Sequence, residues 1–157
     1  MKKINIAVVG LGQIGNYLLH ELNSKKKDIE LKTGKQINVV AISAKNINKK
    51  RKYKINKKLF FKNPLDIFKF KKIDILFESI GLSGGISKKV VEKAIKNKVH
   101  VITPNKALIA KHGDYLSKLA EKHKVNLEFE ASVAGGIPIL RTIKEGLATN
   151  KIFEVYG

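Results

Sequence analysis

The chain has 157 residues, of which 43% are hydrophobic, enough for one domain with a buried core. Its net charge is +19, but thirty of its 32 basic residues are lysine. Proteins that bind nucleic acid favour arginine and interleave aromatic side chains, so a general lysine bias explains this charge better than nucleic-acid binding. The absence of cysteine excludes disulfides and thiolate metal sites. No signal peptide and no apolar run of roughly 18 residues is present, so we expect a cytoplasmic protein without a membrane partner.

Apolar runs rich in β-branched residues alternate with amphipathic patterns along the chain. Strands are expected at residues 4–9, 37–43, 73–78, 99–102, 125–130 and 152–156. Helices are expected at residues 14–22, 63–68, 86–97, 105–111, 114–123 and 139–146. Because strands that alternate with helices form parallel sheets, we predict an α/β fold, a doubly wound parallel sheet of Rossmann type with helices on both faces.

Several boundaries depend on single residue types. Asn63 and Pro64 suit the cap and first turn of the short helix, and Gly113 divides the two helical pieces on either side of it. The polar stretch 25–36 reads as a helix end followed by a loop. The strongly basic stretch 44–58 has no periodicity, so we expect a mobile, solvated loop there.

Three glycines between the first strand and the first helix have the spacing of a dinucleotide-binding turn. Gly10 would allow the sharp turn, Gly12 the approach of the backbone to a pyrophosphate, and Gly15 the close packing of helix and strand. The helix N-terminus, with Gln13 and Ile14, would then hold the phosphates. The pattern predicts a dinucleotide site, and a plain tight turn is the alternative.

The end of the second strand bears on which dinucleotide binds. A site specific for NAD places Asp or Glu there to accept from the ribose 2′-hydroxyl, but this chain has Ser43 and Lys45. Lys45 could pair with a 2′-phosphate and Ser43 could hydrogen-bond to it, which favours NADP over NAD. In so lysine-rich a chain, an ordinary surface lysine is the alternative. After the third strand, Ile80 and Gly81 begin a glycine-rich loop that suits the nicotinamide ribose, or is simply a flexible connection.

Lys106 lies in the first turn of the helix that follows the fourth strand. Aligned peptide dipoles give that end about +0.5 of a charge, so a cation there costs a few tenths of a kcal/mol. Thr103 ends the strand, Pro104 fixes the turn, and Asn105 is a natural helix cap. In such sheets ligands bind beyond the carboxyl ends of the strands, so Lys106 is a candidate to polarise a carbonyl oxygen or to pass a proton to it as hydride arrives. A solvated surface lysine is the alternative.

Glu130 ends the fifth predicted strand, just before a turn of small residues over 131–138. One carboxylate beside several exposed carbonyls offers the ligands that a hard cation takes. A purely structural turn explains the same residues equally well.

Residues 103–109 (TPNKALI) and 130–138 (EASVAGGIP), together with the turn at 10–15, strongly resemble homoserine dehydrogenases. The resemblance covers essentially the whole chain, and is poorest over 44–58. It implies that residues 1–150 form the N-terminal NAD(P)-binding domain of that family, and that 151–157 are the first strand of, or a linker into, a substrate and dimerisation domain. The implied reaction is the reduction of L-aspartate 4-semialdehyde to L-homoserine by NAD(P)H, on the route to threonine, methionine and isoleucine.

The resemblance also implies roles for single residues. Lys106 would act in proton transfer or substrate placement, and Lys45 stands where many members carry Arg, consistent with NADP. The family's monovalent cation, such as sodium, would be held by Glu130 and the backbone carbonyls of Val133, Gly135 and Ile137.

The family's further domain supplies a catalytic Asp and Lys, the substrate contacts and most of the dimer interface, and it has no counterpart in these 157 residues. We therefore expect the full-length enzyme to be a homo-oligomer acting on a small molecule. The chain by itself is expected to bind nucleotide with little or no turnover. Two other interpretations remain: the cofactor domain of another two-domain oxidoreductase, and a nucleotide-binding regulatory module.

Overall fold

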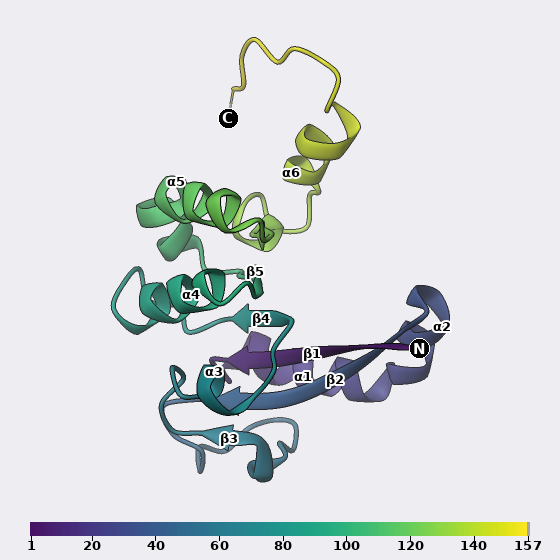
Figure 1. Ribbon diagram of the computed structural model, residues 1–157, viewed down its shortest axis with the longest axis vertical. Helices are drawn as coiled ribbons and strands as arrows, with labels where there is room; N and C mark the ends of the chain where they lie inside the picture. The colour runs from purple at the N-terminus through teal and green to yellow at the C-terminus, as the bar shows by residue number, and fades with distance from the viewer. Residues whose placement is uncertain (157) are drawn as a thin grey trace.

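One parallel sheet organises the chain, with the strand order β3-β2-β1-β4-β5-β6 (Figure 1). This computed structural model describes residues 1–156, apart from the side chain of Phe70. The strands are β1 (Lys2–Val9), β2 (Lys35–Ser43), β3 (Phe60–Phe61), β4 (Ile75–Glu78), β5 (His100–Ile102) and β6 (Leu127–Glu128). The order reverses between β1 and β4, so the predicted doubly wound Rossmann-type sheet is confirmed.

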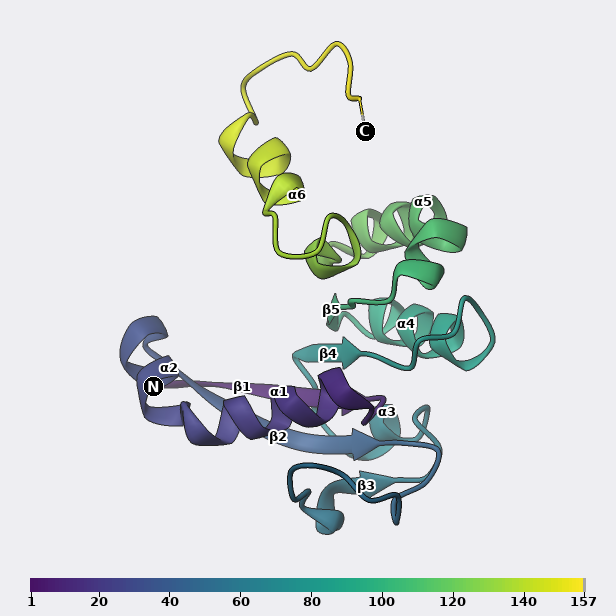
Figure 2. The same ribbon diagram turned by 180° about the vertical axis from the view of Figure 1, so that it is seen from behind.

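Helices cover both faces of this sheet, as predicted. The helices are α1 (Gln13–Ser24), α2 (Lys26–Thr33), α3 (Ile67–Phe70), α4 (Ile86–Lys96), α5 (Lys106–His123) and α6 (Ile139–Arg141). Single turns of other helix types are η1 (Lys57–Leu59), η2 (Glu130–Ser132) and η3 (Thr142–Gly146). Helix α1 lies on one face, which Figure 2 shows in front, whereas α3, α4 and α5 pack on the other.

The core consists of one apolar cluster on each side of the sheet. Along β1, Ala7 and Val9 belong to the cluster under α4 and α5, and Ile6 and Val8 belong to the cluster under α1. Successive side chains of a strand point to opposite faces, which explains why β1 is apolar at every one of these positions. Full burial of an aliphatic side chain such as that of Leu76 contributes about 1.5–3 kcal/mol.

The parallel strands all end at the same edge of the sheet. Val9, Ser43, Glu78, Ile102 and Glu128 are the last residues of β1, β2, β4, β5 and β6. The segments that follow them carry nearly all the candidate site residues, so the fold brings those residues to one edge.

The stretch 25–36 was expected to be a helix end followed by a loop, and the loop part of this prediction is wrong. A second helix, α2, occupies Lys26–Thr33 and ends at Gly34, which has a left-handed φ of 64°. None of its residues is buried, so it has no apolar periodicity that the sequence could reveal.

Two further boundaries differ from the prediction. Asn63 begins a turn by accepting from the Leu65 N–H, and helix α3 starts only at Ile67, after Asp66. Helix α5 is continuous and Gly113 does not divide it. A Cβ on Gly113 would lie 3.2 Å from Ile109 Cγ2, so the glycine permits close packing within the helix rather than ending it.

The predicted strand at 125–130 is reduced to the two residues of β6, and β3 was not predicted. Both lie at the edges of the sheet, where only one neighbour supplies hydrogen bonds. The predicted strand at 152–156 is wrong, because these residues have no strand partner within the described part of the chain and lie in an irregular segment beyond α6 (Figure 1). The predicted helix at 139–146 is confirmed as α6 and η3. In the described part of the chain, no helix has the length and apolar character needed to span a membrane.

Candidate functional site

The three glycines of the turn after β1 have different surroundings. Gly10 has a φ of 91°, and a side chain there would overlap the backbone of Ser79. A Cβ on Gly15 would overlap the carbonyl oxygen of Gly10 and lie 2.8 Å from Ser79 Oγ. At Gly12, by contrast, a Cβ would meet no atom of the described residues within 4 Å. Gly10 and Gly15 are therefore packed against the protein, and Gly12 faces open space.

Helix α1 begins at this turn with its first N–H groups uncapped by any described side chain. Gly12 is the N-cap residue, and no acidic residue lies in the first turn. The uncapped N–H groups and the positive end of the helix dipole together favour an anion, as they do at the phosphate sites of this fold class.

A groove of about 950 Å³ runs from the glycine turn to the end of β2. It brings together five of the predicted site residues: Gly10, Gly12, Ser43, Lys45 and Ile80. The rest of the lining was not predicted and consists of Val9, Leu11, Ala44, Asn46, Lys49, Arg51, Lys62, Pro64, Ser79, Leu82 and Ile86. Four cations and no carboxylate line the groove, which suits a ligand with several phosphates.

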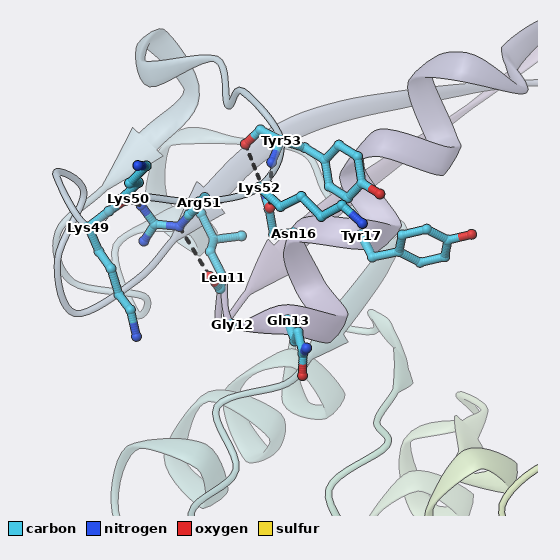
Figure 3. A pocket seen from close by; sticks show the side chains of 10 residues that line it. All are labelled: Leu11, Gly12, Gln13, Asn16, Tyr17, Lys49, Lys50, Arg51, Lys52 and Tyr53. Carbon is cyan, nitrogen blue, oxygen red and sulfur yellow. Dashed lines mark hydrogen bonds between the residues drawn. The ribbon is translucent and has the colours of Figure 1, made fainter.

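Three other predicted residues lie beside the groove rather than in its lining. Gln13 lines a smaller pocket of about 550 Å³ (Figure 3), which shares Leu11, Gly12, Lys49 and Arg51 with the groove. Ile14 is 56% exposed on the first turn of α1. Gly81 is also exposed and has a φ of 85°.

The basic segment 44–58 is an irregular loop with mostly exposed side chains, as predicted, but hydrogen bonds hold it against the glycine turn and α1. The guanidinium of Arg51 donates to four backbone carbonyls, one of which, Leu11 O, belongs to the turn. The other three carbonyls are those of Asn46, Ile47 and Lys49 in the segment itself. Figure 3 shows Arg51 reaching Leu11 from the segment.

A second contact fixes this segment to helix α1. The side-chain amide of Asn16 donates to Tyr53 O and accepts from Tyr53 N, both at 3.0 Å (Figure 3). The ring of Tyr53 stacks on that of His20 with centroids 4.0 Å apart. Asn16, Arg51 and Tyr53 were not predicted from the sequence. A signal was present in Arg51, because an arginine in a chain of thirty lysines suggests that the guanidinium geometry itself is needed.

Lys106 is the first residue of α5, in the first turn as predicted, and its side chain is exposed. Asn105 is confirmed as the helix cap, since its Oδ1 accepts from the Leu108 N–H at 3.1 Å. Thr103 and Asn105 are 1% and 5% exposed, and both bond to the carboxylate of Glu78. These two side chains therefore lie beneath the surface that carries Lys106.

Glu78 is a further residue of this edge that was not predicted from the sequence. It ends β4 and is fully buried, at the sheet edge where the candidate residues gather. The available signal was an acidic residue ending an otherwise apolar strand.

The predicted cation residues follow β6. Glu130 accepts from the backbone N–H groups of Leu140 and Arg141, one on each carboxylate oxygen, at 3.1 and 3.0 Å. It thereby joins the start of η2 to α6. The hydrogen bond from Arg141 to Glu145 raises the pKa of the Arg141 guanidinium above its ordinary value. Val133, Gly135 and Ile137 lie in the turn between these two helical pieces.

Comparison with known proteins assigns this arrangement to a family. The family model described as "Homoserine dehydrogenase, NAD binding domain" matches residues 10–130, which include the glycine turn, Lys45, Lys106 and Glu130. The chain belongs to the homoserine dehydrogenase family. It corresponds to the NAD-binding domain of that family.

Relatives in the homoserine dehydrogenase family match the chain over its whole length. It is 38% identical to the homoserine dehydrogenase of Neisseria gonorrhoeae over 157 residues, and 32% identical to that of Bacillus subtilis over 159 aligned residues. In both cases the match covers 100% of this chain and 36% of the relative. The chain thus spans about a third of the length of these relatives.

Solved structures of the family show the same fold. The homoserine dehydrogenase of Thiobacillus denitrificans superposes with a TM-score of 0.82 and 35% identity, covering 97% of this chain and 35% of that one. A hyperthermophilic archaeal homoserine dehydrogenase solved in complex with NADPH has a TM-score of 0.68 and 22% identity, covering 90% of this chain and 48% of that one. The second likeness supports the fold alone.

Proposed function

We propose that this chain binds NADP(H) in preference to NAD(H), with the dinucleotide lying in the groove between the glycine turn and the end of β2. The observation that carries the proposal is the charge of that groove. Lys45, Lys49 and Lys62 line it near the end of β2, and no carboxylate among its lining residues could accept from a free ribose 2′-hydroxyl. A 2′-phosphate would find cations there, and a 2′-hydroxyl would lack its usual acceptor.

The residues present fit the rest of a dinucleotide. Open space beside Gly12 and the uncapped N-terminus of α1 suit the pyrophosphate. Ile80 and Gly81, at the end of β4, would contact the nicotinamide ribose. The guanidinium of Arg51 already donates to four carbonyls, so we assign the 2′-phosphate to the lysines and not to Arg51.

Substitution of Lys45 tests this proposal. Lys45→Glu removes one cation and supplies the missing carboxylate, so we expect NADPH affinity to fall about tenfold or more and NADH affinity to hold or rise. Both constants are measured by nicotinamide fluorescence titration. Lys122→Glu makes the same charge change on an exposed residue at the far end of α5 and should leave the ratio of the two constants unchanged. An unchanged ratio in Lys45→Glu would refute the 2′-phosphate role, and no binding to the unmodified chain would refute the nucleotide site.

We further propose that the protein acts as a homoserine dehydrogenase, with L-aspartate 4-semialdehyde as substrate and Lys106 as its catalytic residue. Bound NADPH would supply the hydride to the aldehyde carbon. The exposed ammonium of Lys106 would donate a hydrogen bond, and then a proton, to the carbonyl oxygen as negative charge develops on it. The position of Lys106 at the carboxyl edge, one residue after the Asn105 cap, supports this assignment.

A monovalent cation such as sodium, on Glu130, Val133, Gly135 and Ile137, is a further part of the family-based proposal, and the residues fit it only in part. Both carboxylate oxygens of Glu130 and the carbonyl of Ile137 already accept backbone N–H groups. A cation would have to share these oxygens through their second lone pairs. No step of the reaction is derived through it.

A further inference from the structure

Glu78 is the one ionisable side chain in the buried set of the described residues, with 0% exposure. A buried carboxylate is costly unless its oxygens accept hydrogen bonds. The proposed function gives this group no role, although it lies at the end of β4 between the turn that contains Lys106 and the loop expected to contact nicotinamide.

Four hydrogen-bond contacts surround the Glu78 carboxylate. Its Oε1 accepts from the Ile80 N–H at 2.8 Å, and its Oε2 accepts from Thr103 Oγ1 at 2.6 Å. Asn105 Nδ2 lies 3.3 and 3.4 Å from the two oxygens and completes the set. The donors come from the loop after β4 and from the turn after β5, so the carboxylate joins these two segments.

Asn105 extends this network to the start of α5. Its Nδ2 also donates to Leu82 O at 3.0 Å, and its backbone N–H donates to Thr103 Oγ1 at 3.1 Å. Its Oδ1 caps α5 through Leu108, directly beside Lys106. The backbone position of Lys106 relative to the 80–82 loop therefore depends on a chain of hydrogen bonds that converges on Glu78.

We propose that Glu78 is a positioning residue for the nicotinamide half of the site. It holds the 80–82 loop and the first turn of α5 in one arrangement and acts on the reaction through them, without touching the substrate. The inference rests on the proposed dinucleotide site. It is specific to one half of that site, because Ser43 and Lys45 at the adenosine half make no hydrogen bond to this network among the described residues.

Glu78→Gln tests this role with little change in volume. The new amide group presents N–H where the carboxylate accepted from N–H or O–H groups, so at least one donor in the network loses its acceptor. We expect NADPH to bind about tenfold more weakly, whereas 2′-phosphoadenosine 5′-diphosphate, which lacks both nicotinamide and its ribose, binds as it does to the unmodified chain. Isothermal titration calorimetry measures both ligands on both proteins.

Two matched variants keep the test decisive. Thr103→Val removes the hydroxyl donor at constant shape and should give the same selective loss even if Glu78→Gln does not fold. Glu128→Gln makes the same chemical change on an exposed carboxylate at the end of β6 and should affect neither ligand. Equal weakening of both ligands in Glu78→Gln and Thr103→Val, or unchanged NADPH affinity in a folded variant, would overturn the inference. If the unmodified chain bound neither ligand, the proposed dinucleotide site would fail first and this inference with it.

Discussion

Gly12 and Gly15 lie three residues apart in one turn, yet a side chain would meet different surroundings at each. At Gly15 it would overlap the Gly10 carbonyl, and at Gly12 it would point into open space in this structure. The backbone of Gly12, with φ −72° and ψ −160°, is also accessible to other residues. The same residue type therefore serves packing at one position and leaves room for a ligand at the other.

Alanine substitutions should separate these two roles. Gly15→Ala forces the backbone of the turn to shift and is expected to cost about 1–3 kcal/mol of folding stability, seen as a lower thermal midpoint. Gly12→Ala should leave the midpoint within about 1 °C, because it introduces no clash, and should weaken NADPH binding about tenfold by filling the path of the pyrophosphate. Calorimetry of the two variants with and without NADPH measures both effects. A stable Gly15→Ala, or a Gly12→Ala with full affinity, would contradict this division.

At the level of elements, segment 44–58 shows how side chains can order a stretch with no periodic pattern. It contains only the start of η1 and has few apolar residues, but Arg51 and the Asn16–Tyr53 pair fasten it to the turn and to α1. It contributes Lys45 and Lys49 to the groove. The arrangement of the proposed phosphate-binding lysines thus depends on contacts of Arg51, Asn16 and Tyr53, to which we assign no contact with the phosphate.

Replacement of Arg51 tests this dependence at constant charge. The ammonium of a lysine cannot reproduce the planar guanidinium, which donates to four carbonyls. Arg51→Lys should therefore raise the rate of amide hydrogen exchange across residues 46–53 about tenfold. It should also weaken NADPH binding. The matched variant Lys50→Arg alters the neighbouring exposed residue, again without a charge change, and should exchange like the unmodified chain. Equal exchange in Arg51→Lys would show that Arg51 does not hold the segment.

At the scale of the whole molecule, two properties of the site are collective. The parallel sheet gathers residues distant in sequence, such as Gly12 and Lys106, at one edge. The net charge of +19 creates a field that attracts anionic nucleotides and falls with salt. The segment 152–156 extends beyond α6 and away from β1 and β4 (Figure 1), and the side chain of Phe153 is 92% exposed.

The 157 residues by themselves are expected to bind NADPH without oxidising it in the presence of L-aspartate 4-semialdehyde, because they span only 36% of the N. gonorrhoeae relative. A chimera that joins this chain to the remaining part of that relative should restore turnover, followed by absorbance at the nicotinamide band. In the chimera, Lys106→Ala should lower kcat about 100-fold or more, as expected for loss of a proton donor, and spare NADPH affinity. Full turnover in that variant would refute the role of Lys106.

The sequence by itself determined the fold class, the glycine turn and the cap at Asn105. These features depend on local patterns, namely apolar periodicity, fixed spacing and a side chain that bonds within one turn. Predictions from these local patterns were wrong for α2, none of whose residues is buried, and for Gly113, which lies inside α5. They were also wrong for residues 152–156, which have no strand partner among the described residues.

Only the tertiary structure revealed the Glu78 network, the attachment of segment 44–58 by Arg51 and Asn16, and the groove that joins Lys45 to the glycine turn. Each of these depends on hydrogen bonds or proximity between residues far apart in the chain. Asn16 and Tyr53, for example, are 37 positions apart, and Glu78 and Asn105 are 27 apart. Nothing in the local sequence around Glu78 shows whether its carboxylate faces water or three hydrogen-bonding partners, because the packing of β4 between β1 and β5 decides that.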